Sequence, residues 1–134
     1  MTNIQSETVQ INSSAEKLFN FLSDFNNIEK LMPSSITDWE SNAEGGSFTI
    51  KGMANIGLKI DEKTPFTKVK MIRTKAPFDL NLNCNINNVG AEASTLQITL
   101  EADLNPMMKM MAETPLRNFI NILANNCQKI FATA

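Results

Sequence analysis

The end of the sequence, residues 105–131, places the strongest constraint on the fold. Asn105 followed by Pro106 predicts the start of a helix, because asparagine caps free N–H groups and proline loses no hydrogen bond at the first helical position. Apolar residues then recur at steps of three and four positions: Met108, Ala112, Leu116, Phe119, Ile120, Leu123, Cys127 and Ile130. Such a helix would run roughly 40 Å. Its apolar face needs a partner surface of similar length, which the preceding residues must supply.

The length and charge of the chain argue against several classes of protein. A chain of 134 residues predicts one domain, spanning 1–134. Its 12 basic and 14 acidic residues are scattered, so we expect no nucleic-acid partner, which would require a basic patch. The sequence has no apolar run of about 18 residues, and its start lacks the features of a signal peptide. We therefore expect no stable insertion into a membrane and a cytoplasmic location.

The absence of histidine and tyrosine bears on the chemistry that the chain can perform. Histidine is the commonest metal ligand and the usual acid or base near neutral pH, so we expect no metal and no cofactor. A catalytic base would have to be Asp, Glu or Lys, and these fall mainly on predicted turns or outward positions, which disfavours an enzyme. The spacing between Cys84 and Cys127 matches no metal-binding motif such as C-x-x-C. We predict two buried free thiols, with a disulfide or a reactive thiol as the alternative.

The first third of the chain predicts a strand and two short helices. Residues 3–11 read as an edge strand. Ser13 with Glu16 three positions later forms a capping box, which predicts a helix from about Ser14 to Leu22. Asp24 or Asn26 then starts a second short helix, which Pro33 stops.

From Ile36 to Leu104 the apolar period drops towards two, with turn residues about every ten positions, which predicts an antiparallel meander. Residues 78–89 alternate regularly, with Leu80, Leu82, Cys84 and Ile86 on one face and a row of asparagines on the other. The asparagine row is an ordinary solvated face or, alternatively, a dimer surface. We therefore predict an α+β fold: a curved antiparallel sheet of about six or seven strands wrapped around a long C-terminal helix, with two short helices after the first strand.

This order of elements, the text VQINSSAEKLFNFLSDFNNIEKLMP at residues 9–33, and a last strand running into NPMM resemble the START-like superfamily, also called SRPBCC or Bet v 1-like. The resemblance covers essentially the whole chain and implies the helix-grip fold. Similar members include polyketide cyclase/dehydrase-like proteins, lipid and hormone carriers, coenzyme Q-binding proteins and co-chaperone-like domains. Because one fold hosts many functions, the function has to be argued from the site.

The resemblance also implies a ligand cavity between the concave sheet and the last helix. By position, the sheet would line it with Phe48, Ile50, Leu58, Ile60, Met71, Leu82, Cys84, Ile98 and Leu100, and the helix with Met108, Met111, Ala112 and Phe119. The chain is short and its inward residues are large, so a small or collapsed cavity is also expected. The predicted function is binding of a small hydrophobic or amphipathic ligand that is lipid, isoprenoid or polyketide-like. The alternatives are a polyketide cyclase/dehydrase-like enzyme and a ligand-free interaction module. We expect the protein to be a monomer or a weak homodimer.

The methionines at the start of the last helix are predicted to form the mouth of such a cavity. Met107, Met108, Met110 and Met111 cannot all face the core, and flexible thioethers suit adaptable binding surfaces. Met53 and Phe78, each beside a turn, are predicted to join this mouth. The alternative interpretation is that the methionines only fill gaps in the core.

Two further residues carry predictions about the site. Pro115 lies inside the last helix, where it predicts a kink or, with Thr114 as a cap, a break into two helices. Arg73 shares a strand face with Met71 and is the predicted polar anchor for a ligand carboxylate. Its alternative interpretation is a guanidinium that reaches water from a strand end.

Overall fold

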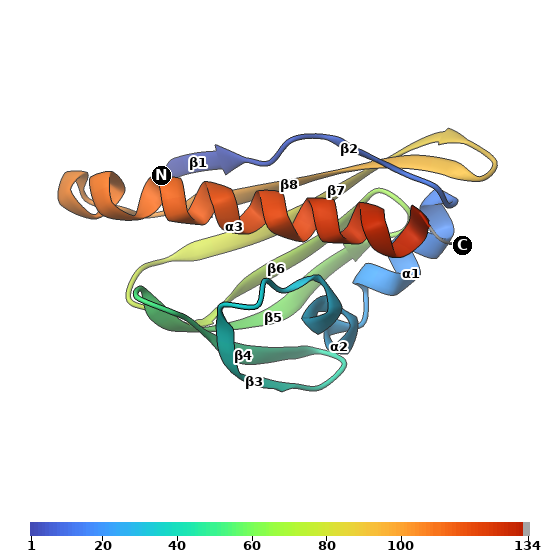
Figure 1. Ribbon diagram of the computed structural model, residues 1–134. Coiled ribbons are helices and arrows are strands. Elements are labelled where there is room, and N and C mark those ends of the chain that lie inside the picture. The colour runs from blue at the N-terminus through green and yellow to red at the C-terminus, as the bar shows by residue number, and fades with distance from the viewer. Residues whose placement is uncertain (133–134) are drawn as a thin grey trace.

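One antiparallel sheet lies against a long C-terminal helix (Figure 1). The computed structural model describes residues 1–132 of the chain. The strands are β1 (Thr2–Gln5), β2 (Val9–Ile11), β3 (Ile36–Ser41), β4 (Gly45–Ile50), β5 (Ala54–Thr64), β6 (Lys68–Lys75), β7 (Leu80–Gly90) and β8 (Ala93–Ala102). The helices are α1 (Ala15–Leu22), α2 (Phe25–Ile28), the short 3₁₀ helix η1 (Glu29–Leu31) and α3 (Pro106–Ala132). The predicted α+β architecture is confirmed.

The strands follow the order β1-β8-β7-β6-β5-β4-β3, and β2 also pairs with β8. The sheet therefore has eight strands where six or seven were expected, because the predicted first strand is divided in two. Ser6 lies at the division: its hydroxyl accepts the N–H of Ile98 at 2.8 Å, and its own N–H donates to the Ile98 carbonyl at 2.8 Å. These two bonds satisfy the backbone of β8 where the ladder is interrupted.

The two short helices begin at side-chain caps. Ser14 caps α1 by accepting the N–H of Lys17 at 3.2 Å, so the predicted cap at Ser13 is wrong by one residue. Ser13 is buried instead, and its carbonyl accepts the hydroxyl of Ser94 at 2.9 Å. Asp24 caps α2 by accepting the N–H of Asn26 at 3.0 Å, so of the two predicted starts, Asp24 and Asn26, the first is confirmed.

Helix α3 begins as the sequence predicts, with Asn105 accepting the N–H of Met108 at 2.8 Å. The helix continues through Pro115 to Ala132, so the alternative of two helices capped at Thr114 is wrong. Its buried residues are Ala112, Leu116, Phe119, Ile120, Leu123, Ala124 and Cys127, which are the predicted apolar stripe with Ala124 added and with Met108 and Ile130 only half-buried at its ends. None of the helices within residues 1–132 is long and apolar enough to cross a membrane.

The inner face of the sheet packs on this stripe. Residues alternate between buried and half-buried along the whole of β8, and the predicted inward residues of β7 are buried.

Cys84 and Cys127 are buried and unbridged, which confirms the prediction of two free thiols. On the outer face, Asn83 departs from the expected solvated row because its side chain is buried between neighbouring strands.

A row of stacked aromatic rings connects the edge strands β3 and β4 with helix α2 on one side and helix α3 on the other. Phe25 of α2 stacks on Trp39 of β3 with a centroid distance of 5.5 Å. Trp39 stacks on Phe48 of β4 at 5.6 Å, and Phe48 stacks on Phe119 of α3 at 6.0 Å. Such offset contacts add to the stabilisation from burial of the rings.

Candidate functional site

The interior between the sheet and α3 is packed where a deep cavity was expected. Eight of the predicted lining residues are at most 7% exposed: Phe48, Leu58, Met71, Leu82, Cys84, Ile98, Leu100 and Phe119. A water-sized sphere therefore touches almost none of their surface, and these side chains fill the core. This arrangement corresponds to the expectation of a small or collapsed cavity.

A groove of about 300 Å³ opens at the N-terminal end of α3, beside this core. We call it the Met groove, and its walls come from the β4–β5 turn, the loop between β6 and β7, and the first turns of α3. The turn and the loop lie at the left end of the sheet in Figure 1, the end at which α3 begins. Its lining residues are Ile50, Lys51, Gly52, Met53, Pro77, Phe78, Met108, Met111, Ala112 and Pro115.

Local sequence fixes two of the three walls. In the β4–β5 turn, Gly52 has a φ of 81°, a conformation that glycine adopts at little cost. The N–H of Met53 donates to the Ile50 carbonyl at 2.9 Å and closes the turn. In the second wall, Phe78 is buried, and the adjacent Asp79 carbonyl accepts the N–H of Asp103 at 2.9 Å. Both segments are therefore held by backbone hydrogen bonds.

The third wall is the methionine-rich start of α3. Met111 lines the groove although it is 73% exposed, whereas Met107 and Met110 are 72% and 87% exposed and lie outside the lining. Met108 lines the groove from a half-buried position against the core. Pro115 has no N–H to donate to the Met111 carbonyl, so the helix lacks one backbone hydrogen bond beside the groove.

The predicted site residues thus fall into separate places. Six of them meet in the Met groove: Ile50, Met53, Phe78, Met108, Met111 and Ala112. Ile60 is half-buried on β5 and lies outside the groove lining. Arg73 lies near the end of β6, outside the groove lining and exposed, with its guanidinium 2.5 Å from the carboxylate of Asp79, which agrees with the alternative of a guanidinium that reaches water from a strand end. Strand alternation indicates a face of the sheet but not whether another element covers that end.

Lys51 is the lining residue that sequence reasoning missed and that changes the chemistry of the groove. It is the single charged side chain among the lining residues that the structure describes. Its position beside Met53, in the same predicted turn, was the available signal. The groove therefore combines apolar walls with one cation.

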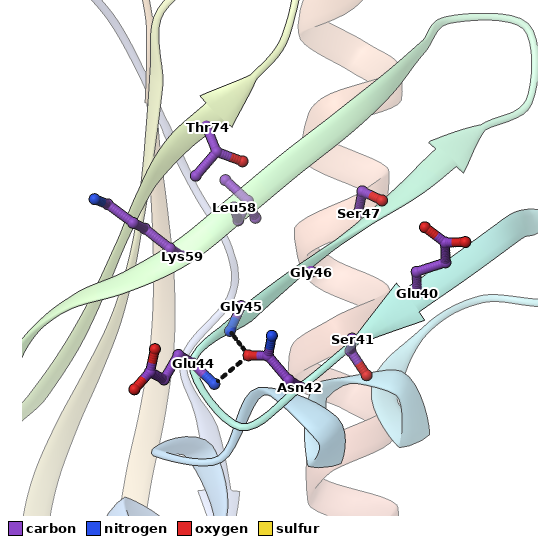
Figure 2. A pocket seen from close by; sticks show the side chains of 10 residues that line it. All are labelled: Glu40, Ser41, Asn42, Glu44, Gly45, Gly46, Ser47, Leu58, Lys59 and Thr74. Carbon is purple, nitrogen blue, oxygen red and sulfur yellow. Dashed lines mark hydrogen bonds between the residues drawn. The ribbon is translucent and has the colours of Figure 1, made fainter.

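A second hollow, of about 470 Å³, lies on the face of the sheet away from α3 (Figure 2). It lies over Gly45 and Gly46, which carry no side chain: a Cβ atom at Gly46 would lie 2.2 Å from the carbonyl oxygen of Glu40. Asn42 fixes its rim by accepting the N–H groups of Glu44 and Gly45 at 2.8 and 3.1 Å. Its charged side chains, Glu40, Glu44 and Lys59, do not converge on one point in Figure 2, so the Met groove is the better candidate site.

Solved structures share this architecture at low sequence identity. A START superfamily protein from Mycobacterium smegmatis is 18% identical with a TM-score of 0.70, and the match covers 98% of this chain and 97% of that one. The protein XoxI from Bacillus cereus is 12% identical with a TM-score of 0.78, covering 98% and 96% of the two chains. The chain has the START-like helix-grip fold.

Norcoclaurine synthase from Thalictrum flavum has a similar structure, with 11% identity, a TM-score of 0.76, and coverage of 99% of this chain and 87% of that one. That enzyme has also been solved in complex with dopamine and hydroxybenzaldehyde. No protein-family model and no curated protein matches the sequence of this chain. At these identities the likeness establishes the START-like fold, and the function has to be argued from the groove.

Proposed function

We propose that the protein binds a small hydrophobic or amphipathic molecule, of lipid, isoprenoid or polyketide-like character, in the Met groove. The observation that carries this proposal is the convergence of six apolar side chains from three separate segments on an open groove beside a packed core. Ligand sites typically combine apolar walls with a few polar groups. The binding of small aromatic molecules by norcoclaurine synthase gives the proposal a precedent in a protein of the same fold.

The size of the groove sets the expected affinity. Its volume of about 300 Å³ is at the lower end of the range for ligand pockets. A ligand that buries about ten methylene groups would gain roughly 8 kcal/mol, before the cost of association is subtracted. We therefore expect dissociation constants between about 1 μM and 1 mM.

Two neighbouring methionines provide a matched test. Met111→Ser removes an apolar wall of the groove, whereas Met110→Ser alters a side chain that is equally exposed but outside the lining. Decanoate, 1-decanol and geraniol are titrated by calorimetry into both variants and the parent protein. We expect at least one probe to bind, Met111→Ser to weaken it about fivefold because about 1 kcal/mol of apolar contact is lost, and Met110→Ser to leave it unchanged.

Both substituted side chains are solvent-exposed, so the variants should unfold at the temperature of the parent protein. The proposal fails if none of the three probes binds. It also fails if Met110→Ser weakens binding as much as Met111→Ser, because the ligand would then lie elsewhere.

A further inference from the structure

We infer that the ligand of the Met groove is an anionic amphiphile whose charged group lies against Lys51. This inference rests on the proposed function and adds the chemical class of the ligand. It follows from the charges at the groove, the character of the walls and the volume that they enclose.

Lys51 is the one cation among the described residues that line the groove. The structure contains four ion pairs within residues 1–132, and Lys51 takes part in none of them. No acidic residue occurs between Glu44 and Asp61, so the turn that carries Lys51 has no carboxylate of its own. Arg73 is already paired with Asp79, next to Phe78. An incoming anion therefore meets an ammonium group at Lys51 that forms none of these ion pairs.

The remaining walls fit the uncharged part of such a molecule. Apart from Lys51, the lining side chains carry no charge, and the thioethers of Met108 and Met111 adapt to irregular shapes. The volume of about 300 Å³ has room for roughly ten groups of the size of a water molecule, and a methylene group is similar in size. We therefore expect an acyl or alkyl chain of about ten carbon atoms.

The position of Lys51 also discriminates between amphiphiles. A cationic head group would bring like charges together, and a neutral hydroxyl could accept a hydrogen bond from the ammonium group but would form no ion pair with it. Lysine acts as a compact point charge without the planar geometry of arginine, so a carboxylate and a phosphate are equally suitable anions. The inference therefore specifies the charge of the head group, and the experiment separates the two kinds of anion.

Four ligands with the same ten-carbon chain test the inference: decanoate, decyl phosphate, 1-decanol and decyltrimethylammonium. Their affinities are measured by calorimetry, below the micelle concentration, in about 20 mM and 300 mM salt. We expect the anions to bind more tightly than decanol and the cation to bind most weakly. Among decanoate, decyl phosphate and 1-decanol, higher salt should weaken the binding of the two anions only, because salt screens an exposed ion pair.

Two lysine variants of the same hairpin complete the experiment. Lys51→Gln should weaken binding of decanoate about two- to fivefold, the range for an exposed ion pair, and should leave decanol unchanged. Lys59→Gln is the matched control, because Lys59 is exposed on β5 and lines the hollow on the other face of the sheet. It should change neither affinity.

The outcomes separate this inference from the function on which it rests. If decanol binds as tightly as decanoate and Lys51→Gln alters neither, the groove binds ligands but the anionic class is wrong. If no ligand binds, or if binding is insensitive to Met111→Ser, both the inference and the proposed function are wrong.

Discussion

Replacing Phe48 with alanine is expected to lower the free energy of unfolding by about 3 to 5 kcal/mol, the usual effect of truncating a buried phenylalanine. Phe48 is 1% exposed and stacks on Trp39 and on Phe119, so the substitution leaves a cavity and removes two ring contacts. Since a domain of this size is stable by about 5 to 15 kcal/mol, the variant would lose a large part of its stability.

Urea unfolding followed by the fluorescence of Trp39, the only tryptophan, measures this loss. Phe66→Ala is a suitable control, because Phe66 is 43% exposed and its one aromatic contact is with Phe19, and we expect it to cost about 1 kcal/mol or less. A loss below about 1 kcal/mol for Phe48→Ala would contradict the packed interior, and would mean that Phe48 lines a space that tolerates its removal.

Raising the pH from 9 towards 12 is expected to destabilise the native state through the two buried thiols. Burial, with a smaller contribution from the nearby Cys127, raises the pKa of Cys84 from 9.0 to about 12. Burial likewise raises the pKa of Cys127 to about 12. Between pH 9 and pH 12 the unfolded thiols have lost their protons while the folded thiols keep theirs. The contribution of the two neutral thiols to the stability of the native state is therefore complete below pH 9 and is lost as the pH rises towards 12.

The expected slope is up to about 1.4 kcal/mol for each thiol and each pH unit. Other groups titrate in the same range, so the measurement compares the parent protein with a Cys84→Ala/Cys127→Ala double variant, by urea unfolding at pH 8, 9, 10 and 10.5. The double variant will be less stable at pH 8 because it has lost packing, but its stability should depend less on pH. Equal slopes in the two proteins would show that the thiols do not titrate differently in the folded state.

Most of the fold follows from local patterns in the sequence. The apolar stripe of α3 and the alternation in β7 and β8 predict the faces that are buried, because these elements pack along their whole length. The sequence does not predict the division between β1 and β2, since it depends on hydrogen bonds between Ser6 and Ile98, which are 92 positions apart. Adjacent serines at 13 and 14 likewise offer two caps, and only the packing of Ser13 against Ser94 decides between them.

The site is less predictable than the fold for a physical reason. Turn positions and surplus methionines indicate which apolar side chains lack a place in the core, and of the residues that they indicate, Met53, Phe78, Met108 and Met111 line one groove while Met107 does not. Side-chain volumes in three dimensions decide whether an inward face encloses a cavity, and here the rings of Phe48 and Phe119 fill the space. Lys51 lines the groove, whereas Arg73 lies outside the lining and pairs with Asp79, and the alternation of residues in a strand predicts neither arrangement.

Methionine-methyl NMR tests most directly the claim that ligand binds in the Met groove and not in the interior. The chain has eight methionines, which can be labelled with ¹³C at the methyl group and assigned by single Met→Leu substitutions. On titration with decanoate or decanol, we predict that the signals of Met53, Met108 and Met111 shift with one common dissociation constant, while that of the fully buried Met71 stays in place. A shift of Met71 without a change in the three groove methionines would contradict this account.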